Sequence, residues 1–199
     1  MSELDSRMQW LGEVDDQTTL EVHRVVSAVV ALGGAVGWLQ IPTLVDIGQW
    51  LGGWRAAVTT KRAGLVLCRV DGQIQALGGW QAGREGAMGH VAELTKVMVH
   101  PGTRGLGLGR LVVDTLIDRA DSSGAELLTL GVRGNNHGAR ALYEACGFTT
   151  WGVLPNGVAV DHHRFDIVRM SRQLRLPADA VIHGSRAGGV GGSPARHDE

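Results

Sequence analysis

A glycine-rich turn between a strand-like stretch and a helical pattern carries the strongest chemical signal in the sequence. It reads Arg-Gly-Leu-Gly-Leu-Gly-Arg from Arg104 to Arg110. The first amides of a helix lack internal partners and lie at the positive end of its dipole, and glycines let an anion approach the backbone closely. With an arginine at each end, this turn predicts a binding site for a pyrophosphate.

Two residues outside this turn have side chains that could take part in proton transfer. Glu93 lies in the alternating stretch that precedes the turn, and Tyr143, the only tyrosine of the chain, lies in a later helical pattern. A carboxylate can accept a proton from an amine or merely bind its charge, and a tyrosine can donate a proton or serve as a packed aromatic residue. The residues by themselves leave both pairs of alternatives open.

The order of the glycines separates this turn from other phosphate-binding motifs. A dinucleotide fingerprint requires a third glycine where Arg110 stands, and the chain has no Gly-Lys-Ser/Thr of a nucleotide P-loop. The sequence instead has Arg104-x-x-Gly107-x-Gly109, followed further on by Asn-x-x-Ala-x-x-Leu-Tyr-x-x-Cys-Gly-Phe over residues 136–148. Together these segments resemble the two conserved blocks of the Gcn5-related N-acetyltransferase (GNAT) family. The resemblance covers residues 60–173 and is greatest to small bacterial members such as the tabtoxin-resistance acetyltransferase.

The resemblance implies a co-substrate, acetyl-CoA, and a set of residues that bind it. It predicts that the pantetheine arm pairs with the backbone of the strand before the turn and that the turn holds the pyrophosphate. The predicted acetyl-CoA-binding residues are Val97, Met98, Val99, Arg104, Gly105, Leu106, Gly107, Leu108, Gly109, Arg110, Asn136, Ala139 and Tyr143.

The resemblance also assigns roles in catalysis. Glu93 matches the general base of many members, and Tyr143 matches the residue that protonates the departing thiolate. A backbone amide near Val97 or Met98 could stabilise the oxyanion. Such relatives can carry a second carboxylate at the end of the next strand, where this chain has Gly131. The acceptor therefore does not follow from the resemblance.

The function expected is transfer of an acetyl group from acetyl-CoA directly to the primary amine of a small molecule, in detoxification of an antibiotic or toxin or in metabolite modification. One alternative is acetylation of a protein lysine or N-terminus, which needs an open groove. Another is a non-catalytic sensor that binds acyl-CoA, which the presence of both Glu93 and Tyr143 argues against. The acyl group need not always be acetyl, and the chain could act as a homodimer.

Periodicity predicts an α/β fold with a mixed sheet of six to seven strands and about four helices on its faces. By resemblance, two central strands splay apart. In the strand of residues 91–100, strict alternation places Glu93 and Val97 on one face and Lys96 and Met98 on the other. The expected strands are 8–14, 64–70, 73–81, 91–100, 125–132, 148–154 and 164–172, with a polar loop at 155–163.

Local signals mark the ends of the expected elements. Asp15 or Asp16 should cap a first helix that ends at 33–37, Thr43 should start a second helix, and Asn136 should cap the fourth. Asp71-Gly72 predicts a tight hairpin. Residues 1–175 should form one domain, and 176–199, which lack apolar periodicity, a disordered tail.

Composition excludes several classes of function. The net charge of −1 argues against a nucleic-acid partner. Cys68 and Cys146 form neither a disulfide framework nor a metal motif, which favours a reduced, cytoplasmic protein. No signal peptide is recognisable, and glycines and polar residues make the uncharged stretch at 25–45 a poor membrane span. Asp161, His162 and His163 fit a solvated turn better than a metal site, and no metal is expected.

The tryptophans near the second helix have two interpretations. Trp50 and Trp54 share a helical face with the apolar residues of that helix, which favours a place in the core. Trp38 precedes this helix in a loop that, by resemblance, lies over the acceptor site. It could therefore be a core residue or form one wall of that site.

Overall fold

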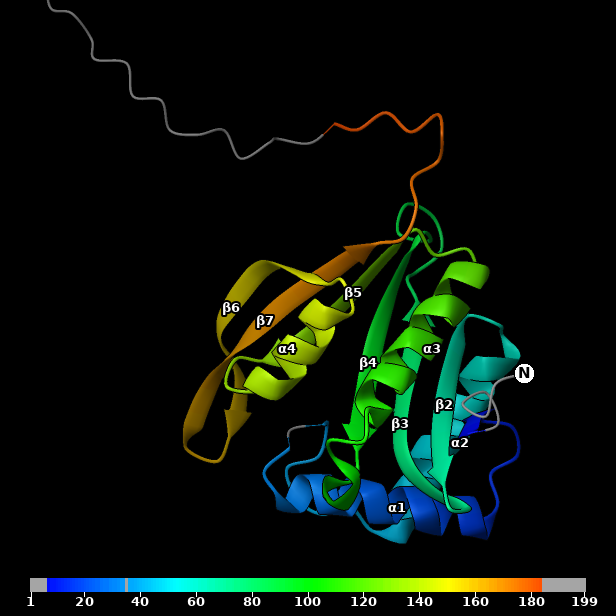
Figure 1. Cartoon of the computed structure of the whole chain (residues 1–199), viewed down its shortest axis with the longest axis vertical. Coiled ribbons are helices and arrows are strands. Elements are labelled where there is room, and N and C mark those ends of the chain that lie inside the picture. Colours follow the sequence, from blue (N-terminus) through cyan, green and yellow to red (C-terminus); the bar gives the residue numbers. More distant parts are fainter. Residues whose placement is uncertain (1–6, 35, 184–199) are drawn as a thin grey trace, which may run out of the picture.

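The computed structural model describes residues 7–34 and 36–183 (Figure 1). Within them the chain forms a mixed seven-stranded sheet in the order β1-β2-β3-β4-β5-β7-β6 and four α-helices, which confirms the predicted fold class. The strands are β1 (Met8–Trp10), β2 (Ala63–Val70), β3 (Gln73–Ala82), β4 (Val91–Val99), β5 (Leu127–Arg133), β6 (Thr149–Val160) and β7 (His163–Gln173). The helices are α1 (Asp16–Ala31), α2 (Leu44–Thr59), α3 (Leu108–Ser122) and α4 (His137–Ala145), with a 3₁₀ turn η2 (Pro101–Thr103).

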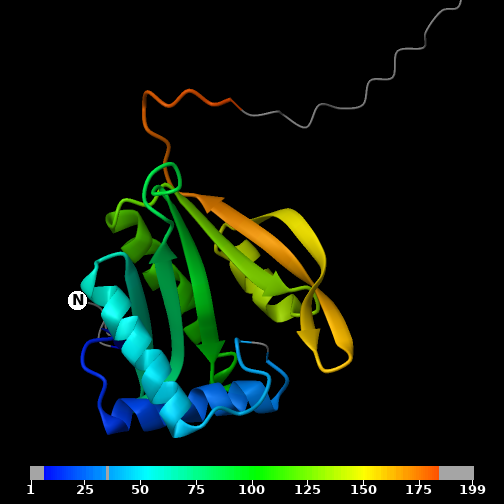
Figure 2. The ribbon, with the colours of Figure 1, turned by 180° about the vertical axis from the view of Figure 1, so that it is seen from behind.

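The helices form a layer on each face of the sheet. Helices α3 and α4 cover one face in Figure 1, and α1 and α2 lie on the other, which Figure 2 shows from behind. Two apolar clusters fill the layers. Buried side chains of α3, such as Val112 and Leu116, pack with β4 and β5 in the first, and side chains of α1 and α2, such as Val25 and Leu51, pack with β2 and β3 in the second.

Short-range signals set the starts of three helices as predicted. The Asp15 side chain accepts a hydrogen bond from the Thr18 amide at the start of α1. Thr43 and Asp46 form a reciprocal capping box at the start of α2. Asn136 accepts from the amide three residues further on and so caps α4. These caps satisfy amides that a helix cannot satisfy internally.

The central strand β4 departs from strict alternation at Lys96. Between the pairs Leu77–Met98 and Gly79–Thr95 the register shifts, so that Gly78 of β3 lies opposite two residues of β4. Lys96 has a φ of 58°, which is typical of a β-bulge. The extra residue turns Val97 to the α3 side with Leu94, and Met98 to the opposite cluster. The alternation predicted for residues 91–100 is therefore wrong beyond Thr95.

Strands β4 and β5 are parallel and pair over only three residues. The pairs join Val91–Glu93 to residues 127–129 of β5, and none is formed beyond Glu93. Figure 1 shows the two strands diverging from this point. The splay expected between central strands is thus present, and it leaves one edge of β4 without a neighbouring strand from Thr95 to Val99.

The last hairpin is longer than predicted. Strand β6 runs through Pro155 to Val160, and a two-residue turn at Asp161 and His162 connects it to β7, where the sequence predicted a polar loop from 155 to 163. Strand β6 is at the edge of the sheet, where proline is tolerated although it lacks an amide donor. The predicted strand at 8–14 is in turn shorter, because it ends at Trp10.

Replacing Gly79 with alanine should destabilise the fold by roughly 1–3 kcal/mol, because overpacking a core forces side chains from their positions. A Cβ at Gly79 would overlap the indole ring of Trp54, which is 5% exposed. Urea unfolding measures the change. Gly53→Ala in α2 is the matched control, because its Cβ would meet nothing within 4 Å. That variant should gain up to about 1 kcal/mol, and equal stabilities of the two variants would contradict the prediction.

The helices in residues 7–34 and 36–183 are all too short or too polar to cross a membrane. Residues 176–183 of the predicted tail form neither helix nor strand. Its remainder, 184–199, lies outside the described residues.

Candidate active site

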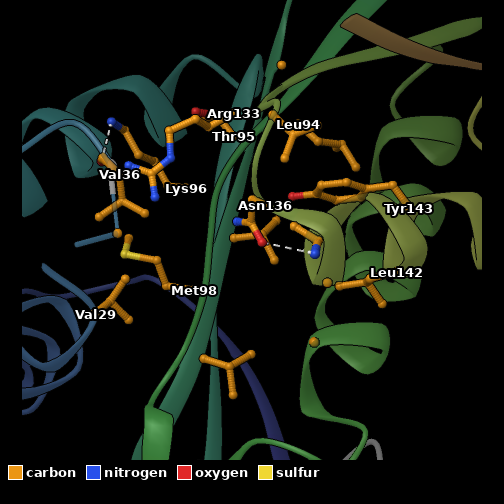
Figure 3. A pocket seen from close by; sticks show the side chains of 18 of the residues that line it. Val29, Val36, Leu94, Thr95, Lys96, Met98, Arg133, Asn136, Leu142 and Tyr143 are labelled. Atoms are coloured by element: carbon orange, nitrogen blue, oxygen red, sulfur yellow. Dashed lines mark hydrogen bonds between the residues drawn. The ribbon is translucent and has the colours of Figure 1, made fainter. Parts of the chain in front are cut away.

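A cleft of about 900 Å³ opens where β4 and β5 separate. The second half of β4 forms one wall, and the end of β5 with α4 forms the other (Figure 3). The start of α3 and the segment after α1 also contribute lining residues. The splay of the sheet therefore creates this cleft.

The glycine-rich turn leaves the start of α3 open to a ligand. Gly105 and Gly107 have φ values of 84° and 75°, in the left-handed region that favours glycine. Gly107 is the N-cap and provides no side-chain acceptor, so the first amides of α3 keep free donors. A Cβ at either glycine would meet nothing within 4 Å, so this space is open to an anion.

The cleft brings together almost all of the residues that the sequence singled out. Of the predicted acetyl-CoA-binding residues, all but Leu106 line it. The Leu106 side chain is 64% exposed and lies outside the lining. Gly109 also has a packing role, because a Cβ there would lie 3.2 Å from Leu142 and 3.5 Å from Val99.

Tyr143 lies on α4 with its hydroxyl end directed toward β4 (Figure 3). Its ring packs edge-to-face against Phe148 with centroids 5.9 Å apart, and the residue is only 8% exposed. Burial, together with the nearby Cys146 thiol, raises the pKa of Tyr143 to about 12. The hydroxyl therefore stays protonated and can act as a donor in the cleft at any physiological pH.

Glu93 lies where β4 and β5 separate, beside a cation that sequence reasoning missed. Its carboxylate is 54% exposed and lies 3.6 Å from the guanidinium of Arg169 on β7. Arg169 occupies the space beside Gly131 of β5, where a Cβ would lie 3.1 Å from the guanidinium. The lack of a side chain at Gly131 thus makes room for a positive charge. No local signal could have revealed this, because Gly131 and Arg169 meet only through the register of β5 and β7.

Lys96 is a second cation that sequence reasoning did not assign to the site. The bulge places its ammonium 2.9 Å from the carbonyl oxygen of Val36 and 5.6 Å from the ring centroid of Trp38. Burial lowers the pKa of Lys96. Gly37 packs directly over this ammonium, where a Cβ would overlap it. Lys96 therefore ties the segment after α1 to the central strand.

Arg133 at the end of β5 is a third cleft cation that sequence reasoning did not assign to the site. Its guanidinium stacks on the ring of Phe165 with 4.8 Å between the guanidinium carbon and the ring centroid. In Figure 3 it extends to the side of β4 opposite Tyr143, the side on which Lys96 also lies. A lone arginine after a predicted strand has no distinguishing sequence signal, so only the fold assigns it to the site.

The tryptophans and the Asp161 turn lie outside the cleft lining. Trp54 is buried, and Trp50 and Trp38 extend from it in edge-to-face contacts, with centroids 6.2 Å and 5.3 Å apart. Core packing is therefore the role of Trp54, as predicted. Trp38 is not a lining residue, but its ring contacts the ammonium of Lys96, which is one. Among the described residues, no group of three or more histidine, cysteine or acidic side chains could hold a metal.

Comparison with known proteins relates this geometry to a family. Residues 38–148, more than half of the chain, match the family model described as the acetyltransferase (GNAT) family. The chain is 31% identical over 87 residues to the L-amino acid N-acyltransferase MnaT of Escherichia coli, a match that covers 43% of this chain and 51% of the relative. It is 35% identical over 85 residues to the [ribosomal protein bS18]-alanine N-acetyltransferase of E. coli, covering 43% of this chain and 57% of that protein.

Solved structures share the fold at low sequence identity. The protein yncA of Salmonella typhimurium, solved with its cofactor acetyl-CoA, superimposes with a TM-score of 0.72 at 23% identity, over 86% of this chain and 96% of that chain. The ribosomal-protein-alanine N-acetyltransferase of Brucella melitensis gives a TM-score of 0.71 at 20% identity, over 84% and 99% of the two chains. The matched segment spans only about half the length of the two curated relatives. From the family model, this chain belongs to the acetyltransferase (GNAT) family.

Proposed function

We propose that the protein transfers an acetyl group from acetyl-CoA to the primary amine of a small molecule. The observation that carries this proposal is the continuous path from the unpaired edge of β4 to the uncapped start of α3. An extended pantetheine arm can pair with a free strand edge, and a pyrophosphate binds well at a helix N-terminus. The family model and the acetyl-CoA bound to yncA support the choice of co-substrate.

The proposed acetyl-CoA contacts follow the length of the cleft. The backbone from Val97 to Val99 pairs with the pantetheine, and the amides from Gly105 to Arg110 hold the pyrophosphate. On the opposite wall Asn136 and Ala139, at the start of α4, flank the arm. This orientation brings the thioester toward the narrow end of the cleft, between β4 and Tyr143.

The chemistry proposed is direct attack on the thioester. An alkylamine with a pKa of about 10.4 is protonated at pH 7, and freeing its lone pair costs roughly 4–5 kcal/mol. Glu93, directly or through a water, accepts this proton. The nitrogen then attacks the carbonyl carbon, and a backbone amide near Val97 or Met98 stabilises the oxyanion. As the C–S bond breaks, Tyr143 donates its proton to the departing thiolate.

A small acceptor is favoured over a protein. We place the acceptor on the side of β4 that faces α1, and we call this the acceptor side. The hydrogen bond from Lys96 to the carbonyl oxygen of Val36 holds the segment after α1 against this side, which narrows the space available to a polypeptide. The alternative, acetylation of a protein N-terminus, is supported by the relatives named for ribosomal protein bS18. A non-catalytic acyl-CoA sensor would need neither a proton acceptor nor a donor. Acetyl-CoA is consumed in the cytoplasm, where we place the reaction.

The test of this function is release of free CoA thiol from acetyl-CoA by the purified protein. The acceptor panel comprises amino acids, polyamines, aminoglycosides, dipeptides and a peptide with N-terminal alanine. Acceptor-dependent release with a small amine supports the proposal, and release with the peptide alone supports protein acetylation. Tight binding of acetyl-CoA without release to any acceptor would indicate the sensor.

Replacing Glu93 with glutamine should lower kcat about 10- to 100-fold at pH 7, because the amide cannot accept the amine's proton. The loss should shrink as the pH approaches the pKa of the acceptor, where the free amine becomes abundant without a base. Initial rates from pH 6 to pH 10 measure both effects. A raised KM with an unchanged kcat would show instead that Glu93 only binds the ammonium group.

A further inference from the structure

The acceptor side of the cleft carries more positive charge than its own acidic groups balance. Lys96, Arg133 and Arg169 all line it, whereas Glu93 is the only acidic side chain among the lining residues. Glu93 lies 3.6 Å from Arg169. Within the part of the chain that the structure describes, Lys96 and Arg133 have no carboxylate partner.

Arg133 is held in a position suited to bind a planar anion. Its contact with the Phe165 ring holds the guanidinium beside the cleft, and a guanidinium presents a planar fork of N–H donors. Such a fork matches the two oxygens of a carboxylate. Arg133 and Phe165 are both partly buried, so the side chain does not extend freely into water.

Lys96 adds a charge that lacks an anionic partner. Its ammonium has one hydrogen bond, to a neutral carbonyl oxygen, and contacts the face of Trp38. Burying a charge without a counter-charge is costly, and burial indeed lowers the pKa of this lysine. An anion bound beside it would remove part of that cost.

Apart from Thr95 and the glycines, the remaining lining on this side is apolar. It comprises Val29, Val36, Met98, Val158 and Ile167. In such surroundings an ion pair is stronger than in water. The apolar groups also suit an acceptor whose own side chain is hydrophobic.

From these observations we infer that the acceptor carries a carboxylate next to its amine, as a free apolar α-amino acid does, and that Arg133 binds this carboxylate with support from Lys96. This inference rests on the proposed function and adds the class of acceptor to it. The ammonium group of the acceptor then lies toward Glu93, and the carboxylate lies toward Arg133. A peptide N-terminus, whose first residue has no carboxylate, lacks this contact.

The experiment compares acceptors that differ only in this carboxylate. Leucine, methionine and phenylalanine are each assayed beside their carboxamides and beside a dipeptide that starts with the same residue. A hydrogen-bonded charge pair predicts a preference for the free acid of roughly 10- to 150-fold in kcat/KM. The amine of an amino acid amide is less basic than that of the free acid, so more of it is unprotonated at neutral pH. This difference favours acetylation of the amide, so it cannot by itself produce a preference for the free acid.

Variants of Arg133 test whether this residue causes the preference for the free acid. In Arg133→Gln the ratio of kcat/KM for acid over amide should fall toward one, and in Arg133→Lys part of it should remain. Arg55→Gln, at an exposed position of α2 outside the cleft, is the matched control and should keep the wild-type ratio. Titration of the CoA-loaded protein with the same amino acids, by calorimetry, provides a measurement that requires no turnover.

The outcomes separate this inference from the proposed function. Equal or faster acetylation of amides or dipeptides would overturn the inference and leave the acetyltransferase function intact. If no acceptor is acetylated, the proposed function fails and calorimetry decides the inference. Amino acid binding that weakens in Arg133→Gln would then support it, and absence of binding would overturn it.

Discussion

Replacing Tyr143 with phenylalanine is expected to lower kcat for acetyl transfer by about 100- to 10,000-fold, the range typical for loss of a positioned general acid. The hydroxyl points into the cleft, and its pKa of about 12 keeps it protonated while the thiolate departs. Phenylalanine preserves the ring that packs on Phe148. Free thiol release under saturating acetyl-CoA measures the loss.

The same variant should keep its affinity for acetyl-CoA and its thermal stability. Calorimetric titration with acetyl-CoA is expected to give a Kd within a few-fold of wild type, because the proposed pyrophosphate site at the start of α3 does not include Tyr143. The wild-type rate should also show no decline up to pH 10 from ionisation of Tyr143. A kcat within threefold of wild type would assign the tyrosine to packing alone.

Replacing Gly107 with aspartate should raise the Kd for acetyl-CoA by about 100-fold or more, equivalent to at least 2.7 kcal/mol. The carboxylate would lie at the uncapped start of α3, where it repels a pyrophosphate and competes for the same amides. Aspartate tolerates the left-handed backbone at Gly107 better than most residues. Calorimetric titration with acetyl-CoA measures the change.

Gly86→Asp is the matched control for this variant. Gly86 has a φ of 84° in an exposed loop outside the cleft, and a Cβ there would also meet nothing within 4 Å. Neither variant should lose much stability, and only the one at Gly107 should lose affinity. Equal affinities would show that the turn does not hold the pyrophosphate. Gly107→Asn, which lacks the charge, should lie between wild type and aspartate.

Features that depend on neighbouring residues were predictable from the sequence. The caps at Asp15, Thr43 and Asn136 and the hairpin at Asp71-Gly72 each involve side chains or glycines within a few positions. The turn before α3 belongs to the same class. These caps and turns depend on the backbone preferences and hydrogen-bonding groups of a few adjacent residues, which can be read from the sequence.

Features that depend on the register between distant strands were not predictable. The bulge at Lys96 arises opposite Gly78 of β3, and it moves both the lysine and Met98 to the acceptor side. The space that Arg169 fills exists because Gly131 faces it across β5 and β7. The sequence predicts a loop from Pro155, because proline is tolerated there only if β6 is an edge strand, and sequence periodicity does not reveal edge strands.

Because β4 and β5 pair over a short distance, acetyl-CoA bound as proposed would contribute to the stability of the fold. Strands β5, β6 and β7 are joined to the rest of the sheet through three residue pairs. A pantetheine arm along β4 would supply hydrogen bonds that the neighbouring strand does not, and saturation at 100 times Kd adds about 2.7 kcal/mol to the free energy of unfolding. Amide hydrogen exchange from Thr95 to Val99 should then report cofactor occupancy, and this part of the sheet should unfold first when acetyl-CoA is scarce.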